Sequence, residues 1–177
     1  MTDLQNRCLD AFPEWLRGLS TDAIELSAVV GDDGVPQPAR LHAASALNYL
    51  FKSLDLIPDG IEDLGFLDDA FVLRVAAKLA KDKGGSGAAI DRLAGGVALI
   101  EELLGKDYAR LVTYTEGLVH GAARGRTAEE VVSDPGVRGA FVSELQAWAA
   151  SYEAPTFARD EKNLVKLTSF LSAKLPG

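Results

Sequence analysis

The chain has 177 residues, of which 47 % are hydrophobic and 25 % are charged, and its formal net charge is −8. This length and composition fit one globular domain with a real core, and the excess of acids disfavours nucleic-acid binding, which requires clustered Lys and Arg. Cys8 is the only cysteine, which excludes an intramolecular disulfide and favours a reducing compartment. No apolar window approaches the roughly 20 residues that span a bilayer, so we expect a soluble, cytoplasmic protein without a transmembrane segment.

Apolar residues recur at three- and four-residue spacings through the first half of the chain, which predicts helices. The predicted helices are residues 4–19, 22–30, 39–54 and 69–81. The last two are apolar around most of their circumference, and the polar stripe of 69–81 consists only of Arg74, Lys78 and Lys81. Helices of this kind belong in a core, so we expect both to be buried.

The second half continues the helical pattern. It predicts helices over residues 88–104, 107–122, 137–152 and 161–175 and a short turn at 128–132, after a flexible, glycine-rich linker at 82–87. Gly95 and Gly96 interrupt the pattern of 88–104, which indicates a kink or a close helix contact. No run alternates with the two-residue period of a strand. The sequence therefore predicts an all-α, compact single-domain helical bundle of about eight helices over residues 1–177.

The segment between the two core helices is unusually acidic. Residues 53–73, SLDLIPDGIEDLGFLDDAFVL, contain six carboxylates. Pro58 disfavours helical geometry at the preceding residue, so the first core helix should end at about residues 54–56. Asp59 and Glu62 fit a capping box, and Asp68 is predicted to cap the second core helix. We expect a proline-broken corner whose aspartates shape the turn.

The same acids also suggest a metal site. A tight turn between antiparallel helices would bring Asp55, Asp59, Asp68 and Asp69 together. Carboxylate clusters suit Mg²⁺ or Ca²⁺, and such an ion could be structural or serve hydrolysis. The segment is not an EF-hand, because Ile57 and Phe66 occupy positions of that loop where ligands are required.

A third interpretation is a contact surface. Leu56, Ile57, Ile61 and Phe66 alternate with the acids of the corner. Mixed apolar and polar patches are typical of protein interfaces. This pattern predicts binding to a protein partner or to a second copy of the chain, with no catalytic residue and no cofactor.

The corner resembles the signature of the YkvA-like family, a bacterial domain of unknown function. Its hallmark is a D-L-I-P-D turn followed by L-G-x-L-D-D, which residues 55–59 and 64–69 match within a motif region of 44–80. The resemblance implies flanking core helices but supplies no reaction. We therefore favour a non-catalytic interaction or structural module, and cation binding stays open as the alternative.

Overall fold

The structure, a computed structural model, describes residues 1–52, 56–57 and 64–177. Its N-terminal helices are α1 (Asp3–Arg17), α2 (Leu19–Val30), α3 (Gln37–Tyr49) and α4 (Leu67–Asp82). They are followed by α5 (Ala88–Ala94), α6 (Val97–Leu104), α7 (Tyr108–Gly117), α8 (Ala128–Ser133), α9 (Pro135–Ser151) and α10 (Glu161–Lys174). Eight of these helices have eight or more residues, which confirms the predicted all-α bundle of about eight helices.

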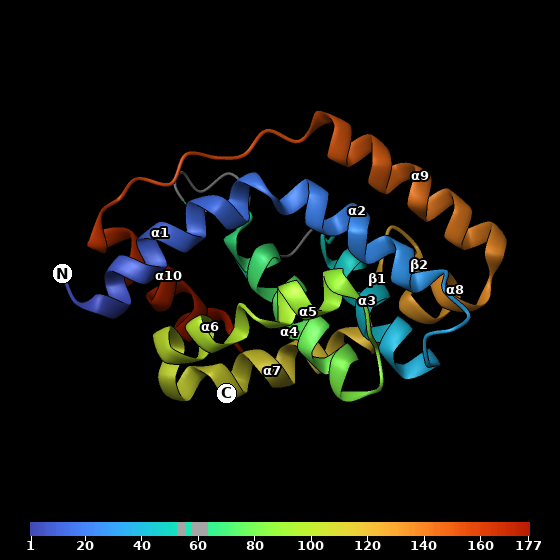
Figure 1. The fold of residues 1–177 in the computed structure, drawn as a ribbon, viewed down its shortest axis with the longest axis horizontal. Coiled ribbons are helices and arrows are strands. Elements are labelled where there is room, and N and C mark those ends of the chain that lie inside the picture. Colours follow the sequence, from blue (N-terminus) through green and yellow to red (C-terminus); the bar gives the residue numbers. More distant parts are fainter. Residues whose placement is uncertain (53–55, 58–63) are drawn as a thin grey trace.

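The helices surround α4. Figure 1 shows α1 and α2 following one another along the long axis, with α9 beside α2 and α10 beside α1. Helix α4 contacts α1, α3, α5, α6 and α7. Twelve of its sixteen residues are buried, as are eight of the thirteen in α3. Both helices therefore lie in the core, as their thin polar stripes predict.

The core consists of two apolar clusters that meet at α4. One face of α4 places Leu67, Phe71 and Val75 in a cluster with α1, α7 and α10. Its other residues, among them Leu73 and Ala76, pack into a cluster with α2, α3, α8 and α9. Trp15, Phe66 and Tyr114 pack against both clusters. The segment that joins α3 to α4 thus begins and ends at the centre of the molecule.

Two predicted helix ends differ from the structure. Helix α3 ends at Tyr49 rather than at residues 54–56, because its last turn tightens through amide bonds from Leu50, Phe51 and Lys52 to carbonyls three residues earlier. Helix α4 begins at Leu67, and the residue before it, Phe66, has the left-handed backbone conformation with φ 68°. The prediction that Asp68 is the N-cap is therefore wrong, since Asp68 lies inside the first turn.

A short hairpin is absent from the predicted elements. After the 3₁₀ helices η1 (Gly105–Asp107) and η2 (Leu118–His120), strands β1 (Ala122–Ala123) and β2 (Arg126–Thr127) pair antiparallel. Both residues of their turn, Arg124 and Gly125, have positive φ, as a two-residue hairpin turn of type I′ requires. Two-residue strands are too short to produce an alternating sequence pattern, so periodicity could not reveal them.

Residues 83–87 join α4 to α5 by a compact turn. The Gly85 amide donates to the Ala80 carbonyl at 2.8 Å, and α5 packs directly against α4. Among the described residues, no helix is both long enough and apolar enough to cross a membrane.

The predicted interruption at Gly95–Gly96 is confirmed, since α5 ends at Ala94 and α6 begins at Val97. A Cβ on Gly96 would lie 2.9 Å from Arg74 Cδ and 3.1 Å from Trp15 Cζ2. Gly96→Ala should therefore lower the free energy of unfolding by about 1–3 kcal/mol through overpacking. Gly139→Ala, at an exposed position in the N-terminal half of α9 where the new Cβ meets no atom within 4 Å besides the neighbouring helix backbone, should raise it by about 0.5–1 kcal/mol.

Urea unfolding of the two glycine variants beside the wild type measures both changes. If Gly96→Ala were as stable as the wild type, the close approach of Gly96 to Arg74 would not constrain the fold.

Candidate functional site

The acidic corner is organised around the buried carboxylate of Asp68. This residue is 0 % exposed. Its Oδ2 accepts a hydrogen bond from the Tyr49 hydroxyl at 2.6 Å and a longer one from the Ile57 amide at 3.4 Å. A buried backbone amide needs an acceptor, and here the acceptor comes from the start of the next helix. Asp68 thereby ties the end of α3, the corner and α4 together.

Tyr49 is the second part of this arrangement. Its hydroxyl donates to Asp68 and accepts from the Leu56 amide at 2.8 Å. Burial, followed by the negative charges of Asp68 and Asp69, raises the pKa of Tyr49 above its usual range. The phenol therefore keeps its proton and acts as a donor to Asp68. Together, the side chains of Tyr49 and Asp68 bind the consecutive backbone amides of Leu56 and Ile57, which belong to the D-L-I-P-D motif.

The four acids of the predicted metal site fall into two groups. Asp68 and Asp69 are both buried, with exposed fractions of 0 % and 1 %. Asp55 and Asp59 lie outside the described residues. Within residues 1–52, 56–57 and 64–177, no group of three or more His, Cys, Asp or Glu could hold a metal ion. Cation binding at the four acids therefore stays a prediction, which a calorimetric titration with Mg²⁺ or Ca²⁺ tests.

The four apolar residues of the predicted contact surface also differ in their placement. Leu56 and Ile57 are buried in the cluster around α1 and α10, so neither reaches the surface in this conformation. Phe66 is half-buried, and its ring centroid lies 5.4 Å from that of Tyr152 and 6.5 Å from that of Trp148. Ile61 lies outside the described residues.

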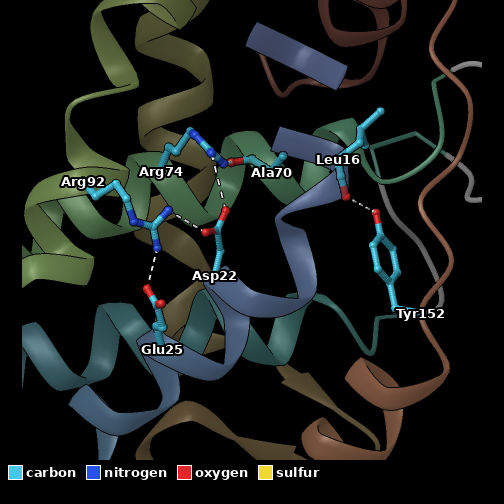
Figure 2. Close-up of polar contacts among 7 residues, drawn as sticks. All are labelled: Leu16, Asp22, Glu25, Ala70, Arg74, Arg92 and Tyr152. Atoms are coloured by element: carbon cyan, nitrogen blue, oxygen red, sulfur yellow. Dashed lines mark hydrogen bonds and ion pairs between the residues drawn. The ribbon is translucent and has the colours of Figure 1, made fainter. Parts of the chain in front are cut away.

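The aromatic residues around Phe66 connect the corner to the C-terminal part of the chain. Trp148 and Tyr152 are half-buried at the C-terminal end of α9, and their ring centroids lie 5.1 Å apart. The Tyr152 hydroxyl also donates to the Leu16 carbonyl of α1 at 2.7 Å (Figure 2). The one described residue of the predicted surface that is partly exposed is therefore packed against the protein's own aromatic side chains.

A buried ion-pair network beside the corner was missed by the sequence analysis. Figure 2 shows Asp22 of α2 between Arg74 of α4 and Arg92 of α5. Arg92 donates to Asp22 Oδ1 at 2.6 Å and to Glu25 at 2.6 Å, while Arg74 lies 3.5 Å from Asp22 Oδ2. Asp22 and Arg74 are 3 % and 4 % exposed. The network fixes three helices relative to one another.

Arg74 also contacts Ala70 and Trp15. It donates to the Ala70 carbonyl at 3.1 Å, and its guanidinium carbon lies 4.0 Å from the ring centroid of Trp15. Burial lowers the pKa of Arg74 to about 10, with the charge of Asp22 opposing this effect. The signal in the sequence was the Gly95–Gly96 pair, since Gly96 leaves the space that the arginine and Trp15 fill.

The fold and the corner define an all-α protein in which two core helices are joined by an acidic, proline-containing segment. Residues 39–74, from α3 to the middle of α4, match a family described as "Protein of unknown function (DUF1232)". The predicted resemblance to the YkvA-like family is thus confirmed for this segment. No curated protein matches the chain, and no solved structure matches it.

Proposed function

We propose that the chain is a non-catalytic helical module in which the DUF1232 segment builds a corner for contact with another protein or a second copy of the chain. The observation that supports a structural role for the corner is the set of hydrogen bonds that the Asp68 carboxylate accepts. This carboxylate and the Tyr49 hydroxyl hold the backbone amides of Leu56 and Ile57. In this role the aspartate of the motif positions the main chain and performs no chemistry.

The contact surface is proposed around Phe66, together with Ile61, which the sequence pattern adds to it and which lies outside the described residues. Phe66 sits in a half-buried group with Trp148 and Tyr152. Aromatic residues are enriched in protein interfaces, where a flat ring buries a large area at low entropic cost. The acids next to Ile61 in the sequence favour a basic partner region.

The combined change Ile61→Ser and Phe66→Asn tests this surface. Asparagine tolerates the left-handed backbone of residue 66 better than most residues, so the variant removes the ring with little backbone strain. We expect a self-associating wild type to shift to a smaller species in analytical ultracentrifugation, or a pull-down partner to be lost, while the helical circular dichroism is retained.

Val165→Ser is the matched control, because Val165 is a 60 % exposed apolar residue on α10, an element remote from the corner in sequence. It should leave association and capture unchanged. The proposal fails if the double variant also behaves like the wild type in both measurements.

A further inference from the structure

Helix α10 packs on a surface formed by α1 and by Arg110 of α7, called the docking surface below. The buried leucines of α10 recur at three- and four-residue spacings and share one apolar cluster with α1. The cluster members on α10 and just after it are Leu164, Leu167, Leu171 and Leu175. Lys162 and Lys166 on the opposite face are exposed. An amphipathic helix of this kind is the usual occupant of an apolar surface between helices.

Arg110 closes the docking surface at the C-terminal end of α10. Its guanidinium donates to the carbonyls of Ser172 and Pro176, both at 3.1 Å, and to the carbonyl of Leu175. Asp107 orients the guanidinium through a hydrogen bond of 2.9 Å. The last carbonyls of a helix have no partner within the helix, so Arg110 binds the end of α10 through its main chain.

The segment 152–160, called the strap below, joins α9 to α10 and contains no helix or strand. Figure 1 shows it as an extended stretch of chain. Its Phe157 ring centroid lies 6.1 Å from that of Phe12 on α1, and Arg159 forms an ion pair with Asp10 on the same helix. This pair is exposed, with 49 % and 69 % of the two side chains accessible. The strap is thus held to α1 by side chains.

Residues 153–156 of the strap have the properties of a hinge. Tyr152 before them is anchored by its bond to the Leu16 carbonyl, and Phe157 after them is buried. No main-chain hydrogen bond joins 153–156 to another described residue, and Pro155 has no amide hydrogen to donate. These four residues can therefore change backbone conformation without breaking a main-chain bond of the described chain. Such hinges allow an element to move as a unit.

We propose that α10 is an exchangeable helix and that the docking surface also binds the α10 of a second copy of the chain. A second copy supplies the same leucines, the same strap and the same helix end, so no new complementarity is needed. At low protein concentration each chain keeps its own α10, because a short connection gives an effective concentration in the ~mM range. The proposal does not rest on the contact surface around Phe66.

The hinge sets the geometry of the exchanged pair. Tyr152 stays on its own α1 while Phe157 reaches the α1 of the second copy, and five residue steps span at most about 18 Å. The two α1 helices therefore lie beside each other.

Two variants with opposite charge changes test the exchange. Asp10→Arg places a cation opposite Arg159, and Arg159→Glu places an anion opposite Asp10, so each variant repels its own strap. In a mixed dimer that exchanges α10, each docking surface meets a strap of opposite charge. The two variants are refolded together from urea at about 1 mM, near the effective concentration of the connected helix. Native mass spectrometry should then show the mixed dimer at roughly tenfold over either homodimer, because two repulsive pairs become attractive.

The matched control is the chain that carries both changes, Asp10→Arg and Arg159→Glu. It restores the pair within one chain and should form no more dimer than the wild type. Mixed dimers at only the statistical twofold ratio would place the contact elsewhere, for example at Phe66, and would overturn the proposal. A mixture without dimers would also overturn it.

Native-state hydrogen exchange of the full chain gives a second test. We expect the amides of α10 to exchange through an opening that leaves α3 and α4 protected. Arg110→Gln removes the bonds to the helix end and should speed the exchange of α10 several-fold. Lys78→Gln, which breaks an exposed ion pair on α4, is the matched control and should leave α10 unchanged. Exchange of α10 only together with α3 and α4, or an α10 unaffected by Arg110→Gln, would overturn the proposal.

Discussion

Asp68→Ala is expected to lower the free energy of unfolding by about 3–5 kcal/mol, because each buried donor that loses its acceptor costs about 1–3 kcal/mol. Among the described residues, the Tyr49 hydroxyl and the Ile57 amide are two such donors. Most domains of this size have only about 5–15 kcal/mol in total, so the loss should be plain in urea unfolding. Hydrogen exchange of the Ile57 amide should become faster in the same variant.

Asp82→Ala is the matched control for this prediction. Asp82 lies on the same helix, but its ion pair with Lys78 is exposed, and exposed pairs within a helix contribute only about 0.3–0.5 kcal/mol. Tyr49→Phe should cost less than Asp68→Ala, and the double variant should cost less than the sum of the two, because they share one hydrogen bond. If Asp68→Ala were no more harmful than Asp82→Ala, and Ile57 kept its protection, the corner would not depend on this carboxylate.

The fold could be predicted because helical periodicity is a local property of the sequence. The thin polar stripes of residues 39–54 and 69–81 placed both helices in the core, where α3 and α4 lie. Helix ends were harder to predict. Pro58 only sets a limit beyond which the helix predicted over 39–54 could not continue. In the structure, α3 ends earlier, at Tyr49, and the residues that follow form turns with hydrogen bonds to carbonyls three residues earlier.

The acids of the corner could be found in the sequence, but their roles depend on residues far along the chain. Asp68 has the sequence context of an N-cap, yet its partners are Tyr49 and Ile57, 19 and 11 residues earlier. Arg74 shares a polar stripe with Lys78 and Lys81, whose side chains are about half exposed. Only Asp22, Trp15 and Gly96, which come from three other parts of the chain, explain why the arginine is buried.

The second large effect is expected for Asp22→Ala. Removing the Asp22 carboxylate leaves the guanidinium of Arg74, which is 4 % exposed, without an acidic partner among the described residues. Breaking a buried pair in this way typically costs about 3–5 kcal/mol, because the remaining charge has lost both its solvent and its counter-ion. Glu25→Ala is the matched control, since Glu25 binds the same Arg92 but is half exposed, and it should cost no more than about 1 kcal/mol.

A second substitution separates the buried charge from a general loss of packing. Arg74→Met keeps an unbranched apolar side chain beside Trp15 and removes the charge. In the Asp22→Ala background it should recover most of the lost stability, because apolar residues of similar volume can replace a buried ion pair at little cost. Urea unfolding of the wild type, both single variants and the double variant gives the coupling energy. A double variant that is no more stable than Asp22→Ala alone would show that the aspartate acts through Arg92 or through the start of α2, and not by neutralising Arg74.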